Sequence, residues 1–474
     1  MKKFDLVIIG GGVAGLVCAS GAAQLGARVA LVDRESLGGD CLRSGCVPTK
    51  RLIQSAKAAS IVRRAAEFGI ETGDVNVNFP KVMESMRGIQ ARIGENDSPE
   101  RFRKMGVEVI LGAGRFVDNY LFEVNGEKLC GKKFIIATGS SPVMLPIAGL
   151  KDSGALTNES ALKLEKLPGS ITILGGGPIG VEFGQVFSRF GSKVTIIERQ
   201  DRILSREDSE VSDMLLKLLV REGIDVITNT EVKEVNESNG KKVIKTHSSS
   251  GDKTFESDEL MIAIGRAPNV EGLNLEGAGI AYDKRKGIKV NEHLQTSQKH
   301  ILACGDVVGS YAFTHVAEYH AGIALSNTLL PIGKRKVDYR VVPWTTFTDP
   351  EFARVGLTEM EAKEEHGEKN ISTYRFYFND VDRAVIEGEG YGIIKVVCHK
   401  KEILGAHILG PHAGELIHEY VLAMNENIPI TKISRAIHVY PTDAMALKRA
   451  ADQYYRARLF TGLFPKIAKR LIRR

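Results

Sequence analysis

The stretch that decides the fold runs from Phe4 to Gly15 and reads FDLVIIGGGVAG. Its apolar half predicts a buried strand of a parallel sheet, and the residues after it predict a helix to about residue 25. Gly10, Gly12 and Gly15 have the spacing of a dinucleotide-binding turn, in which glycines let the backbone and the helix N-terminus approach a pyrophosphate. A second apolar run then ends at Asp33, which is placed to accept a hydrogen bond from a ribose hydroxyl.

Residues 170–198 repeat this order of elements. An apolar run leads into Gly175, Gly177 and Gly180, a predicted helix follows, and a second apolar run ends at Glu198. Two such fingerprints predict two dinucleotide sites in one chain. The carboxylate of Glu198 would repel a 2′-phosphate, which favours NADH over NADPH. NADPH stays the alternative because two basic side chains follow, Arg199 and Arg202.

The composition narrows the class of protein. The 474 residues suffice for two or three domains, and 43% hydrophobic and 26% charged residues are typical of a soluble globular protein. No run approaches the ~18 apolar residues of a membrane span. Six cysteines in so long a chain do not form a disulfide scaffold, so the expected compartment is the cytoplasm. The net charge of +6 lies mostly in the C-terminal tail, so no nucleic-acid-binding face is expected.

Two cysteines five positions apart, Cys41 and Cys46, are the candidate redox centre. In a regular helix this spacing gives a rise of roughly 7.5 Å, whereas a disulfide needs Cα atoms roughly 4.4–6.8 Å apart. A bridge therefore requires a distorted helical turn, which Gly45 and Pro48 would permit. A strained bridge near the surface of a cytosolic protein favours redox chemistry over a structural role. The alternatives are two unrelated thiols or half a zinc site, although the sequence offers no second cysteine pair to complete one.

The other four cysteines stand alone in apolar or helical surroundings and are expected to be small buried residues. They are Cys18, Cys130, Cys304 and Cys398.

Residues 39–50, which read GDCLRSGCVPTK, resemble the signature of the class I pyridine nucleotide–disulfide oxidoreductases, a family that includes dihydrolipoamide dehydrogenase, glutathione reductase and mercuric reductase. The resemblance covers essentially the whole chain. Residues 134–140 and 261–266 resemble the family's two strand-to-glycine crossovers, and 296–306 its second flavin motif. Further elements resemble its dimerisation domain, at 343–359 and 410–415.

The resemblance implies an α/β fold with three parts. Two Rossmann-like domains would bind FAD (residues 1–150 and 280–342, discontinuous) and NAD(P) (residues 151–279), and an α+β domain (residues 343–474) would form the dimer interface. A homodimer is expected because the family's active site borrows residues from the partner chain.

The resemblance also implies the cofactors and their residues. FAD is expected at the first fingerprint and a nicotinamide nucleotide at the second. To the fingerprint residues it adds further cofactor-binding positions: Gly39, Lys50, Thr138, Gly139, Gly265, Asp306 and Ala317. Asp306 would hold the ribityl chain.

The resemblance assigns roles to four residues near the flavin. Lys50 and Glu182 would pair beside it, where an ammonium could stabilise its reduced form; a purely structural salt bridge is the alternative. Cys46 would lie nearer the flavin, and Cys41 would be the outer thiol that meets the substrate. Electrons would pass from NAD(P)H through FAD to this disulfide and on to an acceptor.

The substrate end departs from the family pattern. Disulfide-reducing relatives carry a histidine before a proline near the C-terminus and a glutamate that orients it. Here Tyr440 takes the histidine position and Met445 the glutamate position. A phenol with a pKa of ~10 is a poor base at neutral pH, whereas an imidazole near ~6.5 is a good one. His438, two residues earlier, would have to turn into the site to replace it.

The expected acceptor follows from this departure. A tyrosine near this point resembles mercuric reductases, whose substrate is a soft metal ion held by thiolates. Those enzymes also carry a C-terminal cysteine pair, whereas this chain has no cysteine after Cys398. We therefore predict a mercuric-reductase-like oxidoreductase, with a metal ion as acceptor and no resident metal. The alternatives are a dihydrolipoamide dehydrogenase, an NADH:quinone or diaphorase-type flavoprotein that does not use the cysteines, and a redox-sensing or structural flavoprotein.

The C-terminal tail combines apolar and basic residues. Phe460, Leu463, Phe464, Ile467 and Leu471 recur at helical spacing between Lys and Arg. Such a segment can lie on an anionic membrane surface. A helix that packs on the dimer and ends in a solvated basic tip is the alternative.

Overall fold

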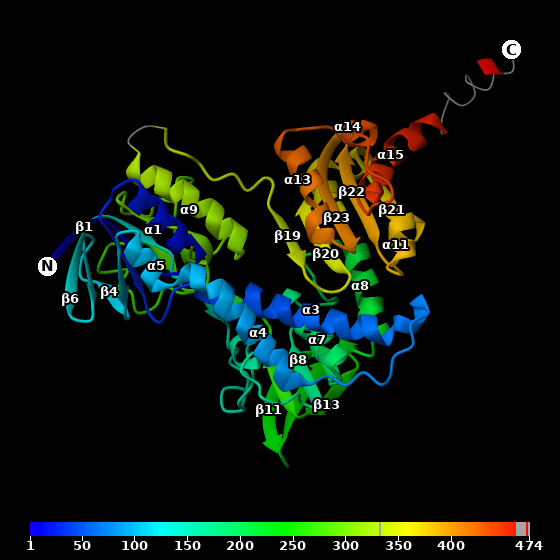
Figure 1. The fold of residues 1–474 in the computed structure, drawn as a ribbon, viewed down its shortest axis with the longest axis horizontal. Helices are drawn as coiled ribbons and strands as arrows, with labels where there is room; N and C mark the ends of the chain where they lie inside the picture. The colour runs from blue at the N-terminus through cyan, green and yellow to red at the C-terminus, as the bar shows by residue number, and fades with distance from the viewer. Residues whose placement is uncertain (331–332, 461–470, 473–474) are drawn as a thin grey trace. The chain divides into compact units, whose positions relative to one another are not determined.

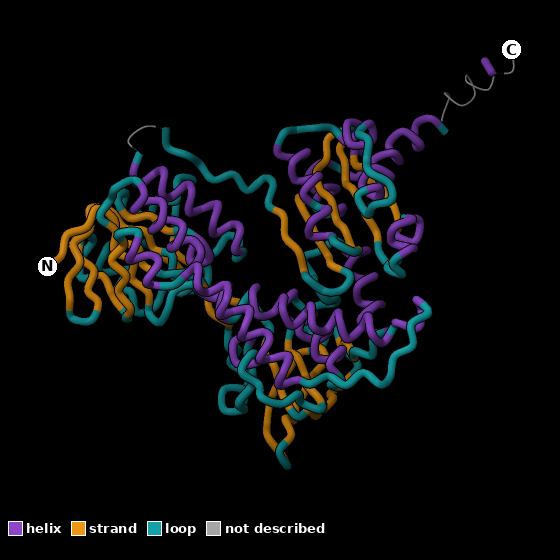
Figure 2. Tube along the Cα trace, in the orientation of Figure 1, coloured by secondary structure: helices purple, strands orange, loops and turns teal. Residues whose placement is uncertain are grey.

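The computed structural model describes residues 1–330, 333–460 and 471–472, and its chain forms two compact units (Figure 1). Unit 1 contains Met1–Gln54, Asn78–Leu167 and Leu260–Asp338. Unit 2 contains Ser55–Val77, Pro168–Glu259 and Tyr339–Arg474. Both units mix helices with strands (Figure 2).

Unit 1 is built on a sheet whose central strands are parallel. In order these are β3 (Val107–Leu111), β2 (Val29–Asp33), β1 (Lys2–Ile9) and β6 (Glu127–Ile136). The first half of β6 pairs with the antiparallel ribbon of β5 (Leu121–Val124) and β4 (Gly114–Phe116), and its second half pairs in parallel with β18 (Ile301–Ala303). The first glycine turn therefore leaves the carboxyl end of a central strand, where such folds bind nucleotides.

Strand β1 is buried on both faces, as expected for the centre of a parallel sheet. Leu6 and Ile8 belong to the apolar cluster formed with α1 (Val13–Gln24) and α9 (Thr314–Leu329). Val7 and Ile9 face the opposite cluster, which contains the rings of Phe116, Phe122 and Phe134. This explains why residues 6–9 read as a continuous apolar run rather than an alternating one.

The remaining elements of unit 1 are short or lie at its edges. Its helices include α2 (Gly39–Arg43), α3 (Cys46–Arg63, which continues into unit 2), α4 (Phe79–Gly94), α5 (Pro99–Lys104) and α6 (Asn158–Ala161). Its small ribbons pair β7 (Ser140–Pro142) with β15 (Arg266–Pro268) and β16 (Tyr282–Asp283) with β17 (Gly287–Ile288). Helix α4 begins at a cap in which the Asn78 side chain accepts a hydrogen bond from the Lys81 N–H at 3.2 Å.

Unit 2 contains the second nucleotide fold. Strands β8 (Ser170–Leu174), β9 (Lys193–Ile197) and β10 (Asp225–Ile227) are parallel, and α7 (Pro178–Phe190) and α8 (Ser209–Arg221) follow β8 and β9. An antiparallel ribbon comes next, formed by β11 (Glu231–Ser238), β12 (Lys241–Ser248) and β13 (Gly251–Ser257), and β14 (Glu259–Ile262) follows it in the chain.

The C-terminal part of unit 2 is an antiparallel sheet covered by helices. The strand order is β19 (Pro343–Thr346), β20 (Glu351–Gly356), β23 (Glu402–Gly410), β22 (Ile393–His399) and β21 (Ile371–Tyr377). Its helices are α10 (Glu359–His366), α11 (Asp382–Ile386), α12 (Ala413–Leu416), α13 (His418–Asn425), α14 (Ile430–Arg435) and α15 (Met445–Leu459). The predicted α/β class, with two nucleotide-binding folds and an α+β C-terminal part, is confirmed.

A cluster of charged side chains is buried in unit 2 where α8 packs on this sheet. Lys395, on β22, is only 2% exposed and forms ion pairs with Asp208, Glu210 and Glu359 at 2.8–2.9 Å. Arg375, on β21, bridges Glu210 and Glu359 at 2.9 Å. One buried ammonium thus balances carboxylates from the nucleotide fold and from the C-terminal domain.

Across residues 1–330, 333–460 and 471–472, every helix is too short or too polar to cross a bilayer. Most of the tail that could lie on a membrane surface, residues 461–470 and 473–474, falls outside the described residues.

Candidate active site

The first glycine turn leaves no room for side chains. A Cβ on Gly10, whose φ is +110°, would lie 2.2 Å from the Ala137 carbonyl oxygen. A Cβ on Gly15 would lie 1.8 Å from the Gly10 carbonyl oxygen, and one on Gly39 would lie 2.6 Å from the Gly12 Cα. The turn is therefore a cradle of bare backbone at the start of α1, as a pyrophosphate requires.

Asp33 at the end of β2 fixes the loops around this cradle. One carboxylate oxygen accepts the Gly11 N–H at 2.7 Å, and the other accepts the N–H groups of Glu35 and Ser36 at 2.9 and 3.0 Å. A carboxylate offers about four acceptor positions. The one left over fits the predicted ribose hydroxyl.

A buried carboxylate lies at the other flavin motif. Asp306 accepts a hydrogen bond from the Ser140 hydroxyl at 2.6 Å, and Arg266 donates to that hydroxyl at 2.9 Å. Arg266 also pairs with Asp40 at 3.1 Å, next to the cysteine motif. Burial raises the pKa of Asp306. A desolvated carboxylate of this kind fits the hydroxyl-rich ribityl chain of FAD.

The other predicted FAD residues lie in the same unit. Thr138 donates its hydroxyl hydrogen to the Asn269 carbonyl oxygen at 2.7 Å, and Gly139 has a φ of +73°. Ala317 is buried on α9, and Gly265 has a φ of +126° just before β15. The bare glycine cradle and the two anchored carboxylates fit FAD, which when bound would supply two-electron transfer.

His320 supports the Asp306 segment from α9. Its Nδ1 accepts a hydrogen bond from the Gly305 N–H at 3.2 Å, so the ring is neutral at that nitrogen. The side chain is fully buried, and burial lowers its pKa to about 4.

The buried ring of His320 makes the protein sensitive to acid. Its folded pKa lies below the ordinary value near ~6.5, so between pH ~6.5 and ~4 the unfolded chain binds the extra proton. The neutral ring makes its full contribution to the free energy of unfolding above pH ~6.5. Below that value the free energy of unfolding is expected to fall by up to about 1.4 kcal/mol per pH unit, down to pH ~4. His320→Gln keeps an acceptor that does not titrate, so urea unfolding at pH 5–8 should show a shallower pH slope. An unchanged slope would contradict this assignment.

The second glycine turn resembles the first. Glu198 accepts the Gly176 N–H at 2.6 Å and the Gln200 N–H at 2.7 Å, one with each oxygen. Gly175 has a φ of +109°, as Gly10 does at +110°. The other two fingerprint glycines, Gly177 and Gly180, lie at the N-terminal end of α7.

The interruption between helices α2 and α3 brings the two cysteines together. Helix α2 ends at Arg43 and α3 begins at Cys46, and between them the N–H groups of Ser44 and Gly45 both donate to the Asp40 carbonyl oxygen, at 2.8 and 2.6 Å. The thiols of Cys41 and Cys46 are close enough to interact, and this interaction raises the pKa of Cys41.

The two thiols differ in their surroundings. Cys41 is half-buried and Cys46 is exposed, and the Cys46 Sγ lies 3.6 Å from the Thr314 hydroxyl at the start of α9. Within the described ranges no three His, Cys, Asp or Glu side chains could hold a metal ion together, so the half-zinc-site alternative gains no support.

The two residues predicted to pair beside the flavin, Lys50 and Glu182, belong to different units. Glu182 is buried on α7 in unit 2 and accepts the Phe347 N–H at 2.8 Å. Lys50 is half-buried on α3 in unit 1. Their pairing stays a prediction.

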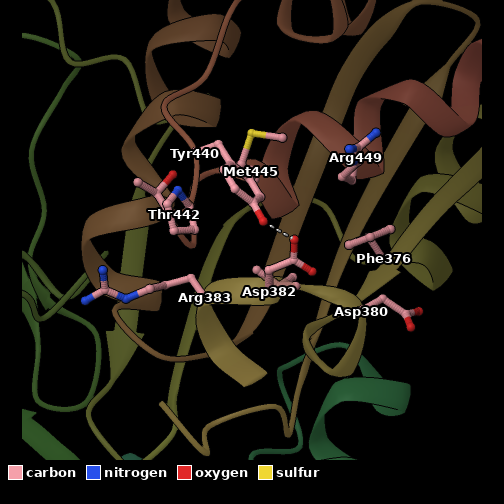
Figure 3. Close-up of a pocket in the computed structure, with 10 residues that line it drawn as sticks. Phe376, Asp380, Asp382, Arg383, Tyr440, Thr442, Met445 and Arg449 are labelled. Carbon is pink, nitrogen blue, oxygen red and sulfur yellow. Dashed lines mark hydrogen bonds between the residues drawn. The ribbon is translucent and has the colours of Figure 1, made fainter. Parts of the chain in front are cut away.

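Tyr440 and His438 at the substrate end both have carboxylate partners, and Figure 3 shows that of Tyr440. Tyr440 is 66% exposed and donates its phenol hydrogen to Asp382 at 2.7 Å, in a pocket that Met445 also lines. His438 has an almost buried side chain whose Nε2 lies 3.2 Å from both carboxylate oxygens of Glu419. Its Nδ1 lies 3.3 Å from the Ala436 carbonyl oxygen, so both ring nitrogens are engaged.

Several of these partners were missed in the sequence: Asp382, Glu419, His320 and Thr314. Each lies 19 or more positions from the residue it contacts, apart from His320, which is 15 positions from Gly305. No motif spacing links them, so only the tertiary fold reveals these contacts.

Two cysteines that look isolated in the sequence are neighbours. Cys18 on α1 and Cys304 after β18 are fully buried; the Cys18 thiol donates to the Ala321 carbonyl oxygen at 3.6 Å and is close enough to the Cys304 thiol to interact with it. The interaction with Cys304 and burial raise the pKa of Cys18 far above its ordinary value, which keeps the thiol neutral and unreactive. Cys398 is also buried, whereas Cys130 is half-buried.

Two glycine-turn nucleotide folds and a pair of neighbouring thiols, Cys41 and Cys46, in one chain define a flavin-dependent pyridine nucleotide–disulfide oxidoreductase. The chain belongs to this family: residues 4–321 match the pyridine nucleotide-disulphide oxidoreductase model, and residues 342–451 match the family's dimerisation domain. The resemblance drawn from residues 39–50 is thereby confirmed. The dimerisation domain implies a homodimer, and the family uses FAD and NAD(P)H.

Its relatives include enzymes that are named for different substrates. A dihydrolipoyl dehydrogenase of Bacillus subtilis is 36% identical over 95% of this chain and 97% of its own. A mercuric reductase of Staphylococcus aureus is 35% identical over 94% and 82%. The solved Cu(II) complex of the HOCl-induced flavoprotein disulfide reductase RclA from Escherichia coli has a TM-score of 0.86 at 30% identity, over 96% and 100%.

Proposed function

We propose that this enzyme transfers electrons from NADH through FAD and the Cys41–Cys46 pair to a metal ion. The observation that carries the choice of acceptor is the phenol of Tyr440, hydrogen-bonded to Asp382 at the position where disulfide-reducing relatives have their base. Cys41 would meet the acceptor, since soft thiolates bind copper and mercury ions well. The copper-bound and mercury-reducing relatives support this acceptor class.

The residues of this chain have separate roles in the proposal. The cradle at Gly10 and the carboxylates of Asp33 and Asp306 would hold FAD, and Glu198 would select NADH. FAD, when bound, supplies the two-electron chemistry that connects a nicotinamide with a disulfide. Lys50, paired with Glu182, would place positive charge beside it.

The proposal extends to the surroundings of the enzyme. The FAD domain would comprise residues 1–150 and 280–342, the NAD domain 151–279 and the interface domain 343–474. The cytoplasm is the proposed compartment, in keeping with a dithiol that NADH keeps reduced. The basic tail would give peripheral contact with an anionic membrane.

An anaerobic assay of NADH oxidation by the FAD-loaded enzyme distinguishes the acceptors. Thiol-complexed Hg(II), chelated Cu(II), lipoamide and a short-chain quinone are compared, with mixtures lacking enzyme or NADH as controls. We expect kcat/KM for at least one metal ion to exceed that for lipoamide by about 10²-fold, because this is the rate factor that a general acid–base group contributes and that lipoamide reduction lacks here. Faster lipoamide turnover would contradict the proposal and make His438 the acid–base candidate. Turnover with quinone alone would favour the diaphorase alternative.

A further inference from the structure

We propose that Asp382 positions Tyr440, and that this pair restricts the enzyme to acceptors whose reduction requires no proton from the active site. The inference rests on the proposed function, because it explains why a metal ion is preferred to a disulfide. Its first observation is the 2.7 Å hydrogen bond from the Tyr440 phenol to the Asp382 carboxylate (Figure 3).

Asp382 is held on a well-packed segment. It is the first residue of α11, and Val381 and Ala384 on either side of it are buried in the core of the C-terminal domain. After the helix, the Glu389 N–H donates to the Ala384 carbonyl oxygen at 2.7 Å, and Arg64 donates to the Gly388 carbonyl oxygen at 2.8 Å. The backbone that carries Asp382 is therefore held in place, so its carboxylate can orient a phenol.

The Tyr440–Asp382 pair takes the place of the histidine–glutamate pair that disulfide-reducing relatives have in this motif. In disulfide-reducing relatives the orienting glutamate follows the histidine on the same stretch, and here that position is Met445. Met445 lines the same pocket but has no acidic group. The carboxylate instead comes from α11, 58 positions earlier. A phenol–carboxylate pair thus stands where an imidazole–carboxylate pair is expected.

The chemistry of this pair differs from that of an imidazole. The hydrogen bond to Asp382 and its negative charge raise the pKa of Tyr440 above its ordinary value. The phenol therefore stays protonated at neutral pH, so it is a poor base, and with its raised pKa it is a much weaker proton donor to a leaving thiolate than an imidazolium. An imidazole with a pKa near ~6.5 gains and loses a proton in each turnover, which this pair cannot do.

The proton balance decides which acceptors this pair can serve. NADH gives up two electrons and one proton as it becomes NAD⁺. A disulfide that takes two electrons and two protons becomes two thiols, so turnover consumes one proton and a site acid must protonate the leaving thiolate. Two Cu²⁺ ions that take two electrons become two Cu⁺ ions, or Hg²⁺ without thiolate ligands becomes Hg⁰, so turnover releases one proton instead. A thiolate that leaves a complexed Hg(II) by exchange with the thiols of Cys41 and Cys46 takes its proton from those thiols and not from a site acid. Only the disulfide reaction requires the missing acid–base group.

The pair lies on a face that the homodimer would cover. Ile437 is fully exposed and Val439 is 75% exposed beside Tyr440, and Val385 and Ile386 on α11 are exposed as well. A second copy seated on these apolar side chains would remove water from the Tyr440–Asp382 hydrogen bond. A hydrogen bond in such a low-dielectric setting is stronger, which would fix the phenol more firmly.

The first experiment measures the ionisation of Tyr440 directly. Ultraviolet difference spectra at 295 nm between each enzyme and its Tyr440→Phe counterpart isolate this phenol during an alkaline titration. Asp382→Asn should move the titration of Tyr440 to lower pH, and Asp382→Glu should restore it in part. Asp380→Asn, a neutralised carboxylate in the same pocket, should leave it unchanged. Equal titration in all variants would overturn the positioning role, whatever the acceptor.

The second experiment tests acceptor choice. Tyr440→His should raise kcat/KM for lipoamide by about 10²-fold, because the introduced imidazole would use Asp382 as its orienting carboxylate. Tyr440→His combined with Asp382→Asn should lose most of this gain, and combined with Asp380→Asn should keep it. An equal gain in both double variants would overturn the inference. If the unmodified enzyme already prefers lipoamide to both metal ions, the proposed function is wrong. The titration of Tyr440 tests the positioning role of Asp382 independently of that outcome.

Discussion

Cys41→Ser is expected to lower NADH-driven reduction of the acceptor by at least about 10³-fold while FAD stays bound. Cys41 is the half-buried member of the pair, and its thiol contacts that of Cys46. A serine hydroxyl has nearly the same size, but it neither binds a soft metal ion nor forms a disulfide. Cys46→Ser should have a comparable effect, because either replacement leaves a single thiol that cannot store two electrons.

Steady-state rates, with flavin absorbance as a measure of cofactor content, test this expectation. Cys130→Ser is the matched control, since Cys130 is half-buried on β6 and lies outside the motif. Thiol titration supplies a second readout: NADH should expose two additional thiols in the unmodified enzyme and none in Cys41→Ser. Full activity in Cys41→Ser would show that electrons leave without the cysteines, as in the diaphorase alternative.

The sequence predicts the nucleotide folds well because their determinants recur at the fixed spacing of one motif. A Cβ on Gly15 would meet the Gly10 carbonyl oxygen, and Asp33 and Glu198 each accept an N–H from the glycine turn of their own fingerprint, 22 positions earlier. The glycines and the acid therefore identify the turn together. The same holds for the cysteine pair. The helix is interrupted at Gly45, inside the motif, and this interruption brings the two thiols together.

The substrate end is less predictable because its partners come from distant elements. Nothing near Tyr440 points to Asp382, and nothing near His438 points to Glu419. Cys18 and Cys304 look isolated for the same reason, although α1 and the segment after β18 bring their thiols together. The sequence shows that Tyr440 departs from the family pattern, and only the tertiary contacts show what replaces the missing group.

Lys395→Met is expected to destabilise the protein by about 3–5 kcal/mol, because it leaves the buried carboxylate of Asp208 without its counter-ion, whereas Glu210 and Glu359 keep their ion pairs with Arg375. The ammonium is 2% exposed and lies 2.9 Å from Asp208, 2.9 Å from Glu210 and 2.8 Å from Glu359. Methionine is similar in length and leaves little cavity, so the loss measures the unpaired charge. Burial opposes the charge on Glu359, yet hydrogen bonds from Lys363 and Lys395 lower its pKa to about 2.

Urea unfolding followed by tryptophan fluorescence tests this expectation. Trp344 is the only tryptophan, and it lies in unit 2, where its Nε1 donates to Glu207 at 2.6 Å and Arg354 lies 4.8 Å above its ring. Lys363→Met is the matched control, since Lys363 also pairs with Glu359 but is 37% exposed, so its loss should destabilise the protein much less than the loss of Lys395.

The pH dependence separates a charge effect from a packing effect in this cluster. Glu359 has a folded pKa of about 2, below its ordinary value near ~4.3, so its ion pairs contribute stability above that value and lose it as the pH falls towards 2. Lys395→Met removes part of the attraction that lowers this pKa. Its destabilisation should therefore shrink as the pH falls from ~4.3 towards 2, where the carboxylate of Glu359 takes up a proton earlier in the variant than in the unmodified protein. A constant loss of stability over that range would mean that methionine disturbs the packing of β22 rather than the balance of charge.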